Sequence, residues 1–316
     1  GTAAFPDSTH SPRASICPSQ MAFAVAQSGM HTITDEHQGR DTLRYVRLML
    51  LVIPLLLLVA IVVYGILTGT IEDSISSYYL GPARDLFVAM LVAIGVLLVV
   101  YKGPPLEDYA LNLAGFYAMF VALVPTKLGE TLANLDAAAA QKLVHSIQVS
   151  VLALLVVATA FVWLDFKTMN WAPRALLQST WTRVLTVASS VLLVGFLVLL
   201  VWRTIEGTEF AGVHVAAALL LISSMGIAIA SHLGSGRLSA TDTSGGRAPH
   251  YAGLLVLMLL GVVAWLVLTA IGVRQALFLV EWYEIALFVY FWYLETKRTW
   301  NPETALRTGR GRHTPT

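Results

Sequence analysis

Two glutamates, Glu281 and Glu284, lie inside an apolar run near the end of the chain, ALFLVEWYEIALFVYFWYLE. In a helix, residues three apart share one face. Counted from Ala276 at 1.5 Å per residue, the pair lies roughly 7 and 12 Å below the end of the run. Two close carboxylates in a medium of low dielectric do not both stay ionised without a cation. The pair predicts a site for a proton, a cation or a substrate. The alternative is a structural pair neutralised by an arginine, or a helix that lies less deep.

A second group of polar residues lies in the stretch SISSYYLGPARDLF, residues 74–87. Asp85 suits the first turn of a helix, where the helix dipole favours a negative charge, whereas Arg84 does not. Arg84 therefore predicts an anionic partner, either a substrate headgroup or the two glutamates. Tyr78 and Tyr79 could line the same site or belong to the aromatic belt at the membrane interface.

Two histidines, His145 and His214, lie near the outer ends of the apolar segments 143–164 and 210–231. A lone histidine inside a membrane is either a hydrogen-bonded packing residue or part of a site. Both lie at the depth of the residues above, which predicts one outer pocket. Its candidate residues are Tyr78, Tyr79, Arg84, Asp85, His145, His214, Glu281 and Glu284. Because they come from separate segments and no local pair such as HExxH fixes a geometry, we expect no metal and no other cofactor.

The composition indicates which elements must position these residues. Of 316 residues, 57% are hydrophobic and 12% charged, and the mean hydropathy is +0.71. Soluble domains carry about 25% charged residues, so the composition excludes disorder, a nucleic-acid-binding surface and an ordinary cytosolic enzyme. The net charge of +1 gives no reason for a polyanionic partner, and the single cysteine, Cys17, excludes an intrachain disulfide and a thiolate metal site. The sequence predicts an all-α integral membrane protein.

Apolar segments of spanning length recur along the chain, since about 20 residues cross a bilayer as a helix. We predict eight spans, at residues 46–68, 84–102, 108–125, 143–164, 182–203, 210–231, 251–273 and 276–296. With the N-terminus inside, fourteen Lys and Arg residues from Arg40 onward fall on the cytoplasmic side and five on the other, namely Arg84, Lys127, Lys142, Arg203 and Arg274. Lys and Arg stay cytoplasmic, so both termini are expected inside, in a cell (inner) membrane.

The predicted domain organisation has three parts. Residues 1–41 are expected to be a disordered tail, residues 42–298 a polytopic helical domain and residues 299–316 a basic cytoplasmic tail. Translation is expected to start at Met21 or Met30 unless the tail is genuine. The polar stretch 127–142 predicts an amphipathic surface helix or a lid.

An inner turn, KGPPLEDYALNLAG, opens the third span. Its acidic residues Glu107 and Asp108 fit the positive end of a helix dipole, so we interpret them as structural. Asn112 is a candidate for a hydrogen bond between helices.

The blocks SISSYYLGPARDLFV, EDYALNLAG and VPT, together with Glu281 and the Phe-Trp pair at 291–292, resemble a family of bacterial multi-pass membrane proteins of unknown activity. The resemblance covers the second, third and eighth spans and implies no catalytic residue. A fainter likeness in general plan links the chain to families that include membrane hydrolases with Ser, Asp and His ligands for zinc. The chain has no His-x-x-x-His pair.

The leading interpretation is a non-enzymatic membrane protein that transports or senses a small solute, ion or lipid at the outer pocket. Its expected partners are membrane lipids and a small solute, proton or cation, and no nucleic acid is expected. Glu281 and Glu284 would bind protons or cations, Arg84 would bind an anionic group, and His214 would tune protonation.

Two alternatives remain open at this point. One is a membrane-embedded metal-dependent lipid hydrolase with His145, His214, Asp85 and a glutamate as ligands, because imidazole and oxygen ligands suit zinc. The other is a structural or accessory subunit whose polar residues only pack helices. The sequence predicts no oligomeric state.

Overall fold

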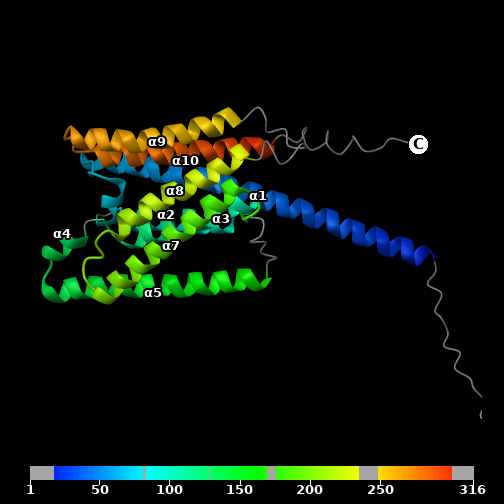
Figure 1. The fold of residues 1–316 in the computed structure, drawn as a ribbon, viewed down its shortest axis with the longest axis horizontal. Helices are drawn as coiled ribbons and strands as arrows, with labels where there is room; N and C mark the ends of the chain where they lie inside the picture. Colours follow the sequence, from blue (N-terminus) through cyan, green and yellow to red (C-terminus); the bar gives the residue numbers. More distant parts are fainter. Residues whose placement is uncertain (1–17, 81–82, 127, 169–175, 235–247, 301–316) are drawn as a thin grey trace, which may run out of the picture. The chain divides into compact units, whose positions relative to one another are not determined.

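The computed structural model describes residues 18–80, 83–126, 128–168, 176–234 and 248–300. Every regular element in these ranges is a helix, which confirms the predicted all-α fold class. The helices are α1 (Pro18–Thr68), the 3-10 helix η1 (Ile75–Leu80), α2 (Arg84–Val100), α3 (Pro105–Leu123), α4 (Leu128–Ala133), α5 (Ala137–Thr168), α7 (Thr180–Glu206), α8 (Val213–Gly234), α9 (Ala248–Ala270) and α10 (Ala276–Trp300) (Figure 1).

Long runs of Leu, Val, Ile and Ala form these helices, whose backbone polar groups are satisfied within each segment, as hydrocarbon requires. Within the described ranges, seven helices are long and apolar enough to cross a membrane, namely α1, α3, α5, α7, α8, α9 and α10. The chain is therefore a membrane-embedded helical protein. Each of the eight predicted segments overlaps a long helix. The one helix of these that is not among the seven is α2, which has 17 residues.

Local signals set several helix ends. Pro105 is the first residue of α3, where a missing N–H costs nothing. At α7, the Ser179 side chain accepts a hydrogen bond from the Thr182 N–H at 3.3 Å, and Gly207 ends the helix at φ 65°. An amphipathic surface helix or a lid was expected at 127–142, and the described residues 128–142 of this stretch are divided between the short α4 and the first turns of α5.

The first helix begins earlier than expected, at Pro18, whereas a tail without regular structure was expected to residue 41. No proline lies between Pro18 and Pro54, and a helix that is already nucleated extends at little cost. Residues 1–17 of that tail, and residues 301–316 of the basic tail, lie outside the described residues. The chain divides into two units, Gly1–Leu43 and Arg44–Thr316. The first unit contains the beginning of α1, and the second contains the rest of α1 and all other described helices.

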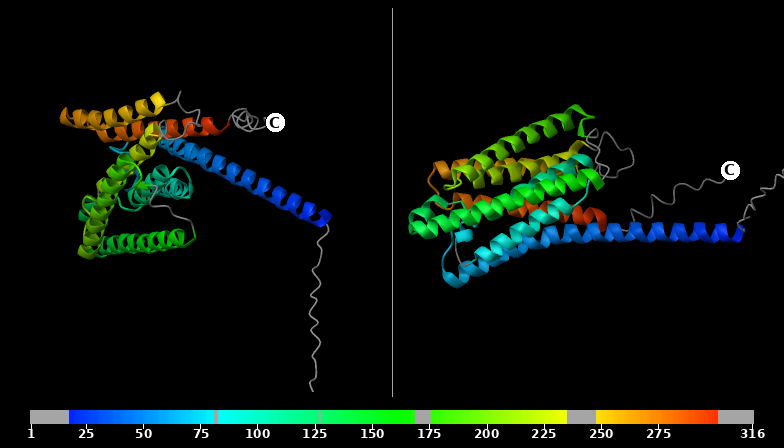
Figure 2. Two further views of the ribbon diagram at one scale, coloured as in Figure 1. Left: turned by 45° about the vertical axis from the view of Figure 1, so that its right-hand side comes forward. Right: turned by 90° about the horizontal axis from the view of Figure 1, so that it is seen from below.

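In the second unit, α3 is the central helix and packs against both α2 and α8. It is the most buried of the candidate spans. Gly95 of α2 and Gly115 of α3 bring two backbones together, because a Cβ on Gly115 would lie 2.5 Å from the Gly95 carbonyl oxygen. Small residues permit this close approach in membranes. A second pair, α9 and α10, lies side by side in every view (Figure 2).

Two clusters of buried side chains fill the interior of this unit. One joins α3, α5, α7 and α8 around Tyr117, Phe120 and Phe196. The other joins α1, η1, α2 and α10 around Leu57, Ile75 and Phe87. Most of α5 and α9 is exposed and apolar, which fits helices that face lipid.

Candidate functional site

The carboxylate of Glu281, on α10, is held by the backbone and a side chain of η1. Its Oε2 accepts a hydrogen bond from the Ile75 N–H at 2.5 Å, and its Oε1 accepts one from the Ser76 hydroxyl at 3.1 Å. The Ile75 N–H is at the start of η1, where amides have no partner within the helix. Glu281 therefore satisfies the first backbone N–H of η1 and fixes η1 against α10.

Ser76 connects Glu281 to His214 of α8. Its Oγ lies 3.0 Å from His214 Nε2, and His214 Nδ1 lies 2.5 Å from the carbonyl oxygen of Val124. A carbonyl only accepts, so Nδ1 carries a proton. The Ser76 hydroxyl has one proton, which it donates either to Glu281 or to His214. We call Glu281, Ser76 and His214 the Glu–Ser–His triad. The Ser76 hydroxyl can bond both neighbours at once only when one of them donates to it. This requires an additional proton, either on Glu281 or on Nε2 of His214.

A cavity of about 290 Å³ opens beside the triad, and its walls are mostly apolar side chains. Its polar lining residues are Ser76, Thr126, His214, Glu281 and Glu284. Glu284 lies three residues after Glu281 and makes no hydrogen bond with any described residue. Binding sites of this kind, apolar with a few polar groups, take a ligand with an apolar body and a polar end.

The structure brings together only part of the predicted outer pocket. Arg84 and Asp85 are exposed in the first turn of α2, and His145 is exposed on α5; none of them lines the cavity. The expected pairing of Arg84 with Glu281 or Glu284 is not present among the contacts of the two described carboxylates. The residues share a predicted depth, but the three exposed side chains do not reach the cavity that Glu281 and His214 line.

The two predicted tyrosines lie in η1. Tyr78 is buried and packs edge-on against Tyr64, with ring centroids 5.5 Å apart. Burial raises the pKa of the Tyr78 phenol above its usual value, so it stays a neutral hydroxyl. Tyr78 is thus a packing residue beside the site, and the side chain of Tyr79 lies outside the described part.

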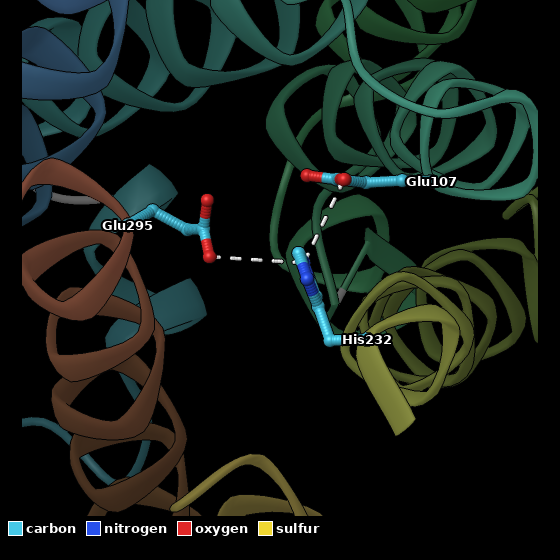
Figure 3. A group of neighbouring side chains, drawn as sticks. All are labelled: Glu107, His232 and Glu295. Carbon is cyan, nitrogen blue, oxygen red and sulfur yellow. Dashed lines mark ion pairs between the residues drawn. The ribbon is translucent and has the colours of Figure 1, made fainter. Parts of the chain in front are cut away.

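A second cluster of ionisable side chains, absent from the predicted pocket, joins three helices. Glu107 of α3, His232 of α8 and Glu295 of α10 point toward one another (Figure 3). His232 Nε2 lies 3.6 Å from Glu107 Oε2 and 3.8 Å from Glu295 Oε1. Both glutamate side chains are fully buried, and that of His232 exposes 8% of its surface. We call these residues the Glu–His–Glu cluster.

Aromatic side chains hold this cluster in place. The Tyr251 hydroxyl donates to Glu295 Oε1 at 2.6 Å, and the Tyr251 ring stacks on the His232 ring with centroids 4.5 Å apart. The Phe291 ring also lies beside the His232 ring, with centroids 5.9 Å apart. These neighbours orient the imidazole and one carboxylate from outside the cluster.

Sequence reasoning missed the Glu–His–Glu cluster although a signal was available. Glu107 was interpreted as a helix-start residue, and His232 and Glu295 lie at the edges of their predicted spans. All three lie near the cytoplasmic ends of segments in the predicted topology, so the depth comparison used for the outer pocket would have grouped them too. Comparison with protein families, curated proteins and solved structures found no match, so both sites are interpreted from their own geometry.

Proposed function

We propose that the chain crosses a cell (inner) membrane eight times, with both termini in the cytoplasm. Two observations support this topology. α2 has 17 residues, which is roughly 26 Å and within the range of spanning helices. With α2 as a span, the excess of Lys and Arg falls on one side, as the positive-inside rule requires.

We propose that the protein binds a small amphiphilic molecule in the cavity and that the Glu–Ser–His triad takes up or releases a proton when it binds. The observation that carries this proposal is the proton count. Ser76 has two neighbours that can each accept its single proton, so the triad has two arrangements that differ only in where the additional proton lies. Intramembrane Glu and His residues of this kind recur in proton relays.

The lining of the cavity supports a particular class of ligand. Its apolar walls favour an acyl or similar chain. Carboxylates at its polar end accept hydrogen bonds from a hydroxyl or amine headgroup and repel an anionic one. We therefore propose a lipid-like molecule with a neutral or cationic headgroup, transported or sensed with a change in protonation.

The two alternative functions predict different behaviour. The hydrolase interpretation needs His145, Asp85 and His214 around one ion, whereas two of these residues are exposed away from the cavity. A purely structural role predicts neither ligand binding in the cavity nor proton exchange. The resemblance to bacterial multi-pass proteins stays a prediction.

The test uses the purified full chain in detergent, with monoolein and dodecylamine as probes. We expect binding of at least one probe by calorimetry, accompanied by release or uptake of a proton, detected with a pH indicator in weakly buffered solution. Glu281→Gln should bind the probe without proton exchange, because the amide cannot take up the proton.

Ala218→Phe tests whether the probe binds in the cavity, and Ala286→Phe is its matched control. Ala218 lines the cavity, so a phenyl ring there should block binding, whereas Ala286 is exposed on α10 and does not line it. Binding that survives Ala218→Phe would contradict the cavity as the site. Probe binding without proton exchange in the wild type would contradict proton coupling.

A further inference from the structure

The Glu–His–Glu cluster lies apart from the cavity, since none of its three residues is among the lining residues. It contains one imidazole nitrogen and two carboxylates, and one atom from each residue lies within 4.8 Å of the other two. We infer that this cluster is a binding site for a divalent transition-metal ion, with zinc as the assigned ion. The inference uses its own residues and does not rest on the proposed proton coupling.

The distances within the cluster are those of ligands around an ion. Nitrogen and oxygen ligands bind zinc at about 2.0–2.2 Å, so two ligands at a tetrahedral angle are about 3.4 Å apart. The two measured separations, 3.6 and 3.8 Å, need only small side-chain rotations to reach this value. They are longer than charge-assisted hydrogen bonds, which measure about 2.7–2.9 Å.

The rival interpretation is a protonated His232 held between the two carboxylates. A single N–H at Nε2 points to one acceptor, but this atom is almost equally far from Glu107 and Glu295. A metal ion at that place would contact both carboxylates and the imidazole together. The near-equal distances therefore favour an ion over an imidazolium.

Glu107 provides an independent sign of a missing partner. Its side chain is fully buried, and neither carboxylate oxygen makes a hydrogen bond with any described residue. A buried carboxylate without such bonds is costly unless a cation compensates it. The Glu107 side chain points into the cluster (Figure 3), where an ion would supply that compensation.

The surroundings suit a cation with imidazole and oxygen ligands. His232 lies in the last turn of α8, whose negative dipole end favours a positive charge. Tyr251 donates to Glu295 and stacks on His232, which is the kind of support that orients metal ligands. Three protein ligands leave a coordination position open, the pattern of zinc sites that also bind water or a substrate.

The test measures the metal directly. The full chain, purified in detergent without chelator and then dialysed, should retain stoichiometric zinc by mass spectrometry. Glu107→Gln, His232→Gln and Glu295→Gln should each lose it. Glu284→Gln, a carboxylate on the same helix as Glu295, and His145→Gln, an exposed histidine, are the matched controls and should keep it.

A second measurement tests the site even if the glutamine variants of the cluster do not fold. Zinc is titrated into metal-free wild type and into Tyr251→Phe, which removes only the hydroxyl that supports Glu295. Loss of a supporting group typically weakens metal binding 10–100-fold, and we expect a loss in this range. No retained zinc in the wild type, zinc that persists in the glutamine variants of the cluster, or an unchanged affinity in Tyr251→Phe would each overturn the site. None of these results bears on probe binding in the cavity.

Discussion

His214 and His232 are carried by the same helix, α8, and their rings enter two separate polar sites. The two histidines are 18 residues apart, which corresponds to roughly 27 Å along a helix and is close to the thickness of the hydrocarbon layer. His214 bonds Ser76 and the Val124 carbonyl, whereas His232 lies between Glu107 and Glu295. The bundle therefore has one polar site near each end of α8, with apolar packing between them.

Ser76→Ala should destabilise the protein by about 1–3 kcal/mol, because Glu281 and His214 would each lose a buried hydrogen-bond partner. Thermal unfolding in detergent measures the change. Ser223→Ala is the control, since the Ser223 hydroxyl is exposed and bonds only its own helix at Leu219. Equal stability of the two variants would show that the Glu–Ser–His triad is not a coupled unit.

Gly115→Ala should separate α2 from α3 and destabilise the bundle by about 1–3 kcal/mol or more, the usual cost of overpacking. The added Cβ would meet the backbone oxygen of Gly95, which cannot rotate away as a side chain could. Gly253→Ala, where nothing lies within 4 Å of the new Cβ, should leave stability unchanged or slightly raised. The comparison uses thermal unfolding, and a tolerated Gly115→Ala would contradict the close approach.

Gly103→Ala should weaken zinc binding while leaving the apoprotein folded. Its Cβ would lie 3.0 Å from both Cδ and Oε2 of Glu107, so the carboxylate must shift by a few tenths of an ångström from the position in which it faces His232. Zinc titration followed by calorimetry gives the affinity, with Gly253→Ala as the matched glycine substitution. Wild-type affinity in Gly103→Ala would mean that Oε2 of Glu107 is not a ligand.

Single cysteines should distinguish eight spans from seven. Cys17 is the only cysteine, so Cys17→Ser gives a clean background. Glu72→Cys and His250→Cys, both at exposed positions, should react with an impermeant maleimide from opposite faces of the membrane. If α2 does not cross, the two positions come to the same face, and labelling of intact and permeabilised cells will show it.

Helix positions could be predicted from the sequence because the length of an apolar run is a local property. The predicted segment 251–273 corresponds to α9, and the predicted segment 182–203 lies within α7. Glu281 was found in the same way, from its depth in an apolar run. The contacts of Glu281 with Ile75 and Ser76 could not be predicted, because they depend on how η1 folds against α10.

The direction in which each side chain leaves its helix could not be predicted. In a soluble protein, a polar face shows which side of a helix meets water. In lipid, the outer face and the packed face are both apolar, so that signal is weak. Arg84 and His145 were therefore grouped with Glu281 by depth alone, and Glu107 was assigned to its helix dipole although it faces His232.

The three glutamates of α10 also bear on how the protein is made. A carboxylate near the middle of a lone helix opposes insertion into the bilayer by roughly 2.5–3.5 kcal/mol, and α10 is among the least apolar of the spanning helices. The groups that bind two of these glutamates, Glu281 and Glu295, belong to η1, α8 and α9, all synthesised before α10. During synthesis, α10 therefore enters the membrane after the helices that contain its hydrogen-bond and ion-pair partners. A circular permutant that begins with α10 would meet the translocon without them, and its yield of inserted protein would fall although the finished structure had the same contacts.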